Sequence, residues 1–570
     1  MKLRSSDGDG GTGAAYRLSE GWYRALSLAV LFLAAMLRFV APDWDGGIAA
    51  HPDERFLVGA AQTVPLYANV CAAIPDFPYG HLPVTLARLV ILTAPGADPL
   101  YALRLCSALV GVVLVALAGA CGRRLAGRAG GLLAAGAAAW APFLIQEGHF
   151  YTVDPLASAL ACAAGLAIGR RRWWAGGALA GLAVACKASL AVVAVPFAIF
   201  GIWVEPATPD IRQAGRRLGA MATGALLAFA AVSPWSLLAS VACWRGPWVQ
   251  SLMASGRVEF PYTLQYANTR PYLYPLAQMS LWGLGPGVTL LGLVGLARAI
   301  LTGDARRRPS VRIGWLLALV YLLGFGGLHV KFARYMLPLY PWWAGLAAYA
   351  ALPGLANKHA RPDRAPAQVS SQPARRIVRA GGLAIAWIPT VLLGIAQTSL
   401  YRAPHPWETA SRWLYANVEP GDTIAVETWD HPLPALLPGQ DPIASQQIEL
   451  PVLAVESPEK MAALEDADRR AAFVVLASRR GYGGISTRPE EYAATLTWYR
   501  NLLSTREARV FARCPSIGPL AVTDDPVADA GLSLGVSLAE RCGASYALRL
   551  PRLDENFRVY DAPTVIVLSE

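Results

Sequence analysis

The sequence predicts a polytopic α-helical membrane protein with a C-terminal α/β domain. Of its 570 residues, 55% are hydrophobic and only 16% are charged, whereas a soluble protein carries about 25% charged residues. The mean hydropathy is +0.37. The apolar residues are gathered into runs, and the composition becomes that of a soluble protein after residue 400. These observations indicate many membrane spans followed by a soluble domain.

The basic residues indicate loops on one side of a membrane. The net charge is +11, and its arginines cluster in short gaps between apolar runs. This distribution is typical of cytoplasmic loops, so we expect the lipid bilayer as a partner and no nucleic acid. The clusters lie at residues 123–128, 170–172, 212–217 and 306–308.

The apolar runs predict roughly eleven spans within a transmembrane domain at residues 23–400. Residues 1–22 form a basic, cytoplasmic N-terminal tail, and the first span is long enough to be retained rather than cleaved. Residues 79–94 are apolar but short, which favours an interfacial segment. The expected spans are 23–40, 100–121, 129–145, 156–168, a hairpin of two spans within 173–204, 218–239, 276–300, 313–328, 336–352 and 381–400.

Residues 401–570 are expected to form an extracytoplasmic α/β domain, because the last span exits on the side opposite the arginine clusters. Short apolar segments at 422–428, 472–478 and 559–568 predict strands, and residues 457–470 and 490–503 predict helices. Cys514 and Cys542 either pair in this domain or remain two thiols. Cys71 lies alone in the first outer loop, and the cysteines in or beside apolar runs, Cys243 among them, are expected to pack as small hydrophobic residues.

Ionisable residues of both signs collect at the predicted outer ends of the spans. A charge at the centre of the bilayer costs roughly 2.5–3.5 kcal/mol, and less near the interface. One such residue can be an interfacial anchor, but six on one side indicate a polar cavity. They are Asp53, Glu54, Asp154, Lys187, Lys331 and Arg334.

This mixture of charges suits the transfer of a sugar from a polyprenyl phosphate. A carboxylate can accept the proton that the attacking hydroxyl loses. The phosphate leaving group needs positive charge, which lysine or arginine can supply. Direct displacement assisted by one base inverts the anomeric carbon. The sequence therefore predicts a multi-pass enzyme of the cell membrane that acts at its outer face.

Several motifs resemble the phospholipid-carrier-dependent glycosyltransferases of family 39, which are relatives of protein O-mannosyltransferases and aminoarabinose transferases in the GT-C superfamily. The motifs are HPDE at 51–54, YGHLP at 79–83, TVD at 152–154, Lys187 and RYMLP at 334–338. Residues 265–274 and 405–413 resemble an uncharacterised bacterial branch. The resemblance implies a GT-C fold and a lipid-linked sugar as donor.

The resemblance also implies roles for single residues. Asp53 is the expected base, with Glu54 as its neighbour and Asp154 as the second acidic position. Structural alternatives stay open, because Asp53 and Asp154 could cap helices and the lysines could be interfacial anchors. The residues expected to bind substrate or carrier phosphate are His51, Lys187, Tyr266, Arg270, Lys331 and Arg334.

Other functions and substrates also remain open. No clear chelating set accompanies the acidic residues, so we expect no metal or other cofactor. A transporter or flippase should show repeats and polar residues at the midplane, and an assembly protein should tolerate the loss of Asp53. The acceptor is a protein, lipid or glycan. A sugar-binding surface in the C-terminal domain could include Glu427, Asp430 and Arg479.

Overall fold

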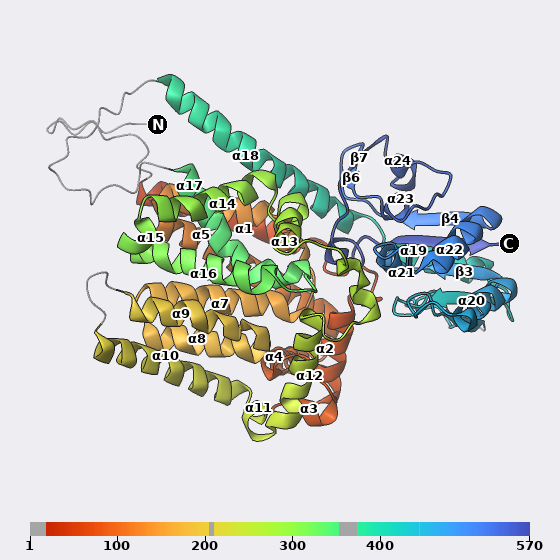
Figure 1. The fold of residues 1–570 in the computed structure, drawn as a ribbon, viewed down its shortest axis with the longest axis horizontal. Helices are drawn as coiled ribbons and strands as arrows, with labels where there is room; N and C mark the ends of the chain where they lie inside the picture. The colour runs from red at the N-terminus through yellow and green to blue at the C-terminus, as the bar shows by residue number, and fades with distance from the viewer. Residues whose placement is uncertain (1–18, 205–209, 353–372, 444) are drawn as a thin grey trace.

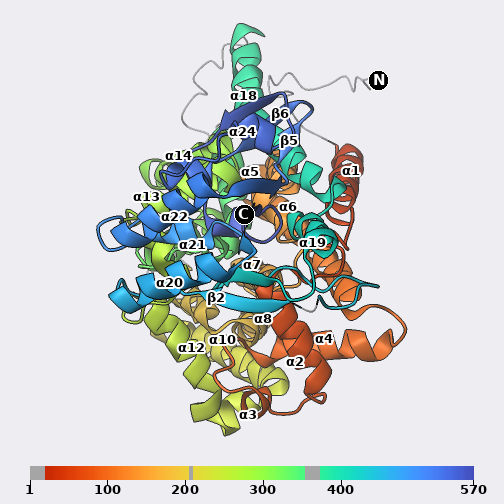
Figure 2. The ribbon, with the colours of Figure 1, turned by 90° about the vertical axis from the view of Figure 1, so that its right-hand side faces the viewer.

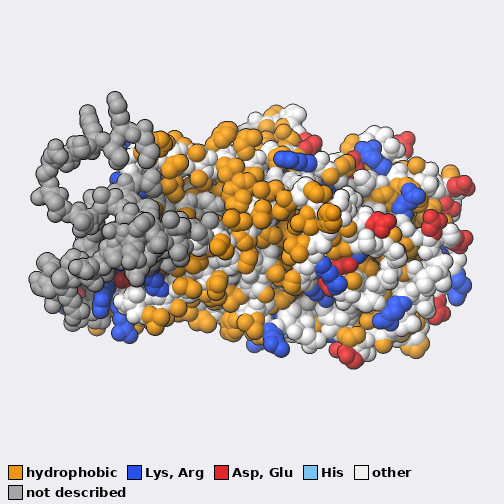
Figure 3. All heavy atoms as spheres, turned by 90° about the horizontal axis from the view of Figure 1, so that it is seen from above, with side chains coloured by type: hydrophobic (Ala, Val, Ile, Leu, Met, Phe, Trp, Pro, Cys, Tyr) orange, Lys and Arg blue, Asp and Glu red, His pale blue; other side chains and the backbone are white. Residues whose placement is uncertain are grey.

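The computed structural model describes residues 19–204, 210–352, 373–443 and 445–570. A bundle of helices forms one end of an elongated molecule and an α/β domain forms the other (Figure 1). Hydrophobic side chains cover much of the bundle surface, and charged side chains are frequent on the α/β domain (Figure 3). Most of the predicted cytoplasmic tail (1–22) and most of the basic loop after residue 352 lie outside the described residues.

The bundle consists of helices that are apolar along most of their length. Three described helices, α1, α5 and α16, are long and apolar enough to cross a membrane, and five shorter apolar helices accompany them. The bundle agrees with the predicted polytopic fold, while the number of eleven spans stays a prediction. The main helices are α1 (Glu20–Arg38), α5 (Pro99–Trp140), α7 (Val153–Gly169), α8 (Trp173–Cys186), α9 (Ala194–Ile202), α10 (Ile211–Val232), α14 (Pro286–Leu301), α16 (Pro309–Gly326), α17 (Tyr340–Ala351) and α18 (Pro373–Ser399).

Helix α5 covers two of the predicted spans. Its helical geometry is interrupted at Ala126 and at Gly127, where φ is +74°. A glycine adopts this left-handed region without the steric cost that a side chain imposes. The interruption therefore bends the chain within the basic segment 123–128, where a loop was predicted.

The first loop folds into helices α2 (Pro52–Thr63), α3 (Val70–Ala73) and α4 (His81–Thr93). Helix α4 is too short to span a bilayer, as the interfacial prediction required. A disulfide joins Cys71 to Cys243 in α12 (Ser240–Ala254). The expectation that Cys243 packs as a small hydrophobic residue was therefore wrong, because the fold brings it to a cysteine 172 residues away.

The C-terminal domain is built on a five-stranded sheet with the strand order β2-β1-β3-β8-β4. Strands β1, β2 and β3 are parallel, and β8 pairs antiparallel with both β3 and β4. Strands β1 and β3 fall within segments predicted as strands, and β8 overlaps the last predicted segment and ends one residue beyond it. Cys514 and Cys542 form a disulfide, which settles the alternative that the sequence left open. The strands are β1 (Thr423–Glu427), β2 (Gln446–Leu450), β3 (Phe473–Leu476), β4 (Glu507–Ala512) and β8 (Thr564–Ser569).

Helices and a second small sheet complete this domain. Helices α20 and α22 lie where the sequence predicted helices. The three strands of the second sheet are ordered β5-β6-β7. The elements are α19 (Pro406–Asn417), α20 (Pro458–Arg470), α21 (Arg480–Ile485), α22 (Ala493–Thr505), α23 (Pro526–Asp529), α24 (Leu538–Arg541), β5 (Ser516–Ile517), β6 (Leu520–Thr523) and β7 (Tyr546–Arg549).

The segment before β8 binds the C-terminal domain to the bundle. Asp561 is fully buried and accepts hydrogen bonds from Gln146 at 3.0 Å, Gln397 at 2.9 Å and the Tyr401 hydroxyl at 3.0 Å. A buried carboxylate with several donors is stable only while all of these partners stay in place. Seen from the side of the C-terminal domain, this domain covers the end of the bundle, and α2 and α4 lie beside it (Figure 2).

Candidate active site

Asp53 lies in the first turn of α2, where the bundle meets the C-terminal domain. Helix α2 begins here because Pro52 fits the first helical position and the His51 Nδ1 accepts the Asp53 N–H at 3.1 Å. The Asp53 carboxylate is 2.8 Å from Arg334 Nη1, and these side chains are 17% and 16% exposed. Burial opposes ionisation of Asp53, but Arg334, together with His51, Tyr79 and Lys187, outweighs it and holds the pKa of Asp53 below its ordinary value. Asp53 is therefore ionised at neutral pH and can be reached from outside.

A second ion pair joins Asp154 to Lys187. Asp154 lies in the first turn of α7, and its Oδ1 is 2.6 Å from the Nζ of Lys187, the residue that ends α8. The ammonium also lies 5.0 Å from the centre of the Tyr335 ring. Arg334 interacts electrostatically with both Asp53 and Asp154. The fold thus brings four of the residues selected from the sequence into one cluster: Asp53, Arg334, Asp154 and Lys187. The alternative role of Asp154 as a helix cap is not observed, because Thr152 occupies the N-cap of α7.

Glu147 is a further acidic residue of this cluster, and the sequence reasoning did not select it. Its side chain is buried, and the Thr152 hydroxyl donates to its Oε2 at 3.4 Å. Burial, and then the charge of Asp154, raises the pKa of Glu147 to about 8. It is therefore mostly protonated at neutral pH. Its position in the same predicted outer loop as Asp154 was the signal that could have identified it.

Glu54 has a different environment from Asp53. Both of its carboxylate oxygens bind Arg104, at 2.9 and 2.7 Å, and the Tyr151 N–H donates to it at 2.7 Å. Arg104 also binds both oxygens of Asp45, at 2.9 and 2.7 Å. Glu54, Arg104 and Asp45 are all essentially inaccessible. The sequence grouped Glu54 with the catalytic residues, whereas the structure places it in a sealed network that anchors α2.

Three residues that were expected to bind substrate make contacts within the protein, and their binding roles stay predictions. The His51 ring packs 4.1 Å from the ring of Tyr560, and burial lowers the pKa of His51 to about 3, so it is neutral. Lys331 donates to the Thr269 hydroxyl at 3.0 Å and to the His329 carbonyl at 2.9 Å. Tyr266 is buried and donates to Asp554 at 3.1 Å, so it holds the C-terminal domain rather than lining an open groove.

Arg270 was also expected to bind substrate, and its side chain is exposed to solvent. The structure gives it no place in the cluster around Asp53. Its expected contact with substrate stays a prediction.

The C-terminal domain contributes residues that the sequence reasoning missed. Arg480 follows β3, donates to the Trp429 carbonyl at 2.8 Å and lies 3.7 Å from Glu555. Tyr560 and Glu555 are close enough to Arg334 to interact with it electrostatically. The basic pair directly after a predicted buried strand was the available signal for Arg480, but its position over the bundle depends on how the domain docks.

The expected sugar-binding surface is mostly buried. Glu427 accepts a hydrogen bond from Tyr499, and Arg479 is paired with Asp524, so neither is available at the surface. Asp430 is only half-buried and accepts from the Ser478 hydroxyl at 2.5 Å, and the next residue, His431, lies 3.4 Å from Arg55 of α2. The prediction was wrong for Glu427 and Arg479 because both side chains turn into the domain.

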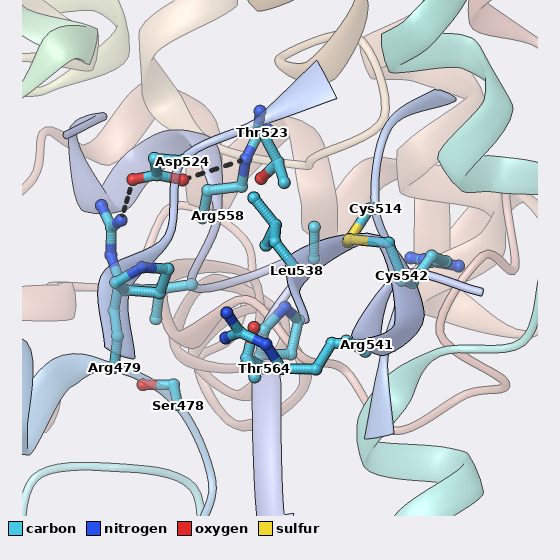
Figure 4. A pocket seen from close by; sticks show the side chains of 16 residues that line it. Ser478, Arg479, Cys514, Thr523, Asp524, Leu538, Arg541, Cys542, Arg558 and Thr564 are labelled. Atoms are coloured by element: carbon cyan, nitrogen blue, oxygen red, sulfur yellow. Dashed lines mark hydrogen bonds and ion pairs between the residues drawn. A yellow bond between two sulfur atoms is a disulfide. The ribbon is translucent and has the colours of Figure 1, made fainter. Parts of the chain in front are cut away.

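A small cavity lies inside the C-terminal domain, beside the Cys514–Cys542 disulfide (Figure 4). The dashed lines show Asp524 between Arg479 and Arg558. A third arginine of the wall, Arg541, pairs with Asp525. The cavity has room for water rather than for a sugar ring. Its charges therefore stabilise the domain and do not form a substrate site.

The acidic residues of the cluster do not fit a metal site. Asp53 and Asp154 each bind a cationic side chain, and Glu147 is mostly protonated at neutral pH, so the three carboxylates do not offer free anionic ligands together. Within the described part of the chain, the grouping with metal-like spacing is Cys71, His81 and Cys243, whose two sulfurs are bonded to each other. The absence of a metal requirement stays a prediction.

Comparison with known proteins supports the resemblance that the motifs indicated. Residues 83–237, which include Asp154 and Lys187, match the family model of dolichyl-phosphate-mannose-protein mannosyltransferase. No curated protein sequence matches the chain. The family resemblance is confirmed, and it rests on this part of the bundle.

Solved structures show the same fold at low sequence identity. The apo oligosaccharyltransferase of Archaeoglobus fulgidus has a TM-score of 0.53 and 15% identity, over 84% of this chain and 71% of that chain. The same archaeal enzyme, AglB, in complex with an inhibitory peptide and a dolichol-phosphate has a TM-score of 0.53 and 14% identity, over 84% and 73%. The apo ArnT of Cupriavidus metallidurans has a TM-score of 0.47 and 17% identity, over 86% and 96%. The likeness to the archaeal oligosaccharyltransferase shows that this chain shares its fold, with helices in a bundle and a C-terminal domain.

Proposed function

We propose that this protein is an inverting glycosyltransferase that moves a sugar from a polyprenyl phosphate to an acceptor hydroxyl at the outer face of the membrane. The observation that carries the proposal is the accessible Asp53–Arg334 pair beside the Asp154–Lys187 pair. This arrangement offers an ionised carboxylate together with two cations. Those are the groups that a proton-coupled displacement of a phosphate requires.

The transfer proceeds in one displacement. The acceptor oxygen attacks the anomeric carbon while its proton passes to Asp53. The bond between the anomeric carbon and the phosphate oxygen breaks, and its electron pair stays on the carrier phosphate. Attack from the face opposite the leaving group inverts the anomeric carbon.

Arg334 has two anionic partners in this mechanism. In the free protein it neutralises Asp53 and holds the pKa of Asp53 below its ordinary value. A bound phosphate competes for the same guanidinium, because arginine binds phosphate oxygens bidentately. Asp53 then loses part of its counter-charge and becomes a stronger base. Donor binding thereby prepares the base for the acceptor.

Lys187 supplies the second positive charge to the phosphate, and Asp154 holds its ammonium in position. Glu54 is a positioning residue, since its network with Arg104 fixes the helix turn that carries Asp53. No resident metal is needed, because the two cationic side chains already supply the positive charge. Turnover should therefore persist in the presence of a chelator.

Two observations support the outer face and the type of carrier. The disulfides Cys71–Cys243 and Cys514–Cys542 lie in the first loop region and in the C-terminal domain, and disulfides persist in oxidising compartments. The archaeal oligosaccharyltransferase of similar fold was solved with a dolichol-phosphate, which is a polyprenyl-type phosphate.

The test compares carrier turnover by wild type, Asp53→Asn and Asp43→Asn in membranes, with a panel of radiolabelled polyprenyl-phosphate sugars. Asp43 is an exposed acid ten residues upstream of Asp53 in the same loop, so its amide variant controls for the loss of one charge. We expect turnover by wild type and by Asp43→Asn, and none by a well-folded Asp53→Asn. Equal turnover by all three would remove Asp53 from the mechanism. Transport of the labelled carrier without transfer would favour a flippase.

A further inference from the structure

Trp429 is an exposed and strained residue at the end of β1. Its side chain is 54% exposed and its φ is +65°. A bulky residue rarely adopts the left-handed region, and such a conformation costs of order 1–3 kcal/mol. The conformation is supported by Arg480, which donates to the Trp429 carbonyl at 2.8 Å. Neither packing of the ring nor a backbone preference therefore explains why a tryptophan occupies this position.

This indole lies next to the cluster around Asp53. Its ring is 5.9 Å from the ring of Tyr262, which comes from the bundle side of the interface. Tyr262 in turn interacts electrostatically with Arg334 and Asp53. The aromatic pair thus extends from the reacting carboxylate to the C-terminal domain.

Polar side chains lie beside the aromatic pair for a topological reason. Strands β1 and β3 are parallel neighbours, so the residues that follow them meet at one edge of the sheet. Ligands bind outside the carboxyl ends of parallel strands in many α/β folds. Here that edge carries Asp430 after β1 and Arg480 after β3, and it contacts the bundle side through His431, which lies 3.4 Å from Arg55 of α2.

We propose that Trp429 and Tyr262 form the acceptor subsite and that the acceptor is a carbohydrate. The C–H face of a sugar ring stacks on the indole, and its hydroxyls bind Asp430 and Arg480. One hydroxyl of the neighbouring unit then reaches Asp53. This inference rests on the transferase function proposed above.

A carbohydrate fits this edge better than the other acceptor classes do. An extended peptide binds mainly through backbone hydrogen bonds along the side of an edge strand. The Trp429 edge instead consists of strand ends with a carboxylate, a guanidinium and an aromatic face. A lipid acceptor requires a continuous apolar groove, and charged residues interrupt this surface.

The experiment uses the full-length protein labelled with 5-fluorotryptophan, in a detergent that has no sugar headgroup. The Trp429→Phe variant assigns the fluorine resonance of Trp429 among the 18 tryptophans. The probes are trisaccharides of glucose, mannose, xylose and N-acetylglucosamine, and a peptide rich in serine and threonine. We expect at least one trisaccharide to shift the Trp429 resonance saturably, and the peptide to leave it unchanged.

The proposal would be overturned if only the peptide shifted the Trp429 resonance. It would also be overturned if none of the probes shifted it. In nanodiscs, broadening of the Trp429 resonance by spin-labelled lipid headgroups would also overturn it, because the indole would then be an interfacial anchor. Tyr546→Ala serves as a matched control, since Tyr546 is 68% exposed in the same domain, and it should leave the saccharide titration unchanged.

The titration is separable from the turnover assay because it needs no donor. Saccharide binding at Trp429 in a protein that turns over no carrier would refute the transferase and retain the subsite. Turnover that depends on Asp53, without any saccharide response at Trp429, would refute the subsite alone.

Discussion

Asp53 and Glu54 are adjacent on one helix but have opposite surroundings. Asp53 is 17% exposed and faces one cation, while Glu54 is inaccessible and is held by Arg104 and a backbone N–H. Successive residues of a helix point about 100° apart. One turn can therefore direct one carboxylate to the boundary between the bundle and the C-terminal domain, and the other into the core. A pair of acids in a motif is therefore not necessarily a pair of catalytic groups.

The largest effect should come from Asp53→Asn. The amide cannot accept the acceptor proton, and the loss of a general base lowers rates by about 10²–10⁴-fold. The melting temperature should fall modestly, because the amide loses the ion pair with Arg334 but its oxygen can still accept a hydrogen bond from it. Donor turnover and thermal unfolding measured on the same preparation check both parts. A rate close to that of wild type would mean that the two acids do not differ as proposed.

Glu54→Ala should act mainly on stability. Asp45 still compensates the charge of Arg104, but the Arg104 Nε–H and the Tyr151 N–H lose their acceptor in a buried place, which costs roughly 1–3 kcal/mol for each donor. Thermal unfolding in detergent should show a large decrease, while the rate per folded molecule falls less than in Asp53→Asn. A stable Glu54→Ala protein without turnover would instead place Glu54 in the chemistry.

Tyr266→Phe should have a smaller effect, on domain docking. The change removes one hydrogen bond to the buried Asp554, and it costs roughly 1–3 kcal/mol because the acceptor stays buried. The Tyr274 hydroxyl still donates to the same carboxylate, at 2.9 Å. Limited proteolysis at the domain interface checks this. Unchanged proteolysis together with weaker substrate binding would restore the groove role expected from the sequence.

Glu147→Gln should leave carrier turnover nearly unchanged at neutral pH, because both side chains are mostly uncharged in the folded protein there. The pKa of Glu147 is about 8 in the folded protein and 4.5 as a free side chain. A raised pKa means that stability is full below pH 4.5 and is lost as the pH rises to 8. Wild type should therefore lose more stability than Glu147→Gln between pH 5 and pH 8. If the free energy of unfolding changed with pH equally in both proteins over this range, the pKa of Glu147 would not be raised by burial.

The sequence predicted what depends on local pattern. Asp53 and Asp154 stood out because charges at the ends of apolar runs are costly, and β1 and β3 followed from short apolar segments. The pairing of Asp53 with Arg334 spans 281 residues, and no local pattern reports such a contact. The burial of Glu54 depends on Arg104, which lies 50 residues away. The position of Arg480 and Tyr560 near the Asp53 cluster depends on domain docking. Neither feature could be predicted from neighbouring residues in the sequence.

The position of β8 has a consequence for biosynthesis. This strand lies between β3 and β4, and the residues just before it supply Asp554, Tyr560 and Asp561, which contact the bundle. A ribosome must translate through Ser569 before the sheet can close. The Asp53 cluster therefore stays uncovered by the completed domain until the final strand is released. A nascent chain stalled before β8 would expose the sheet's interior to chaperones and proteases, although every residue of the Asp53 cluster had already been made.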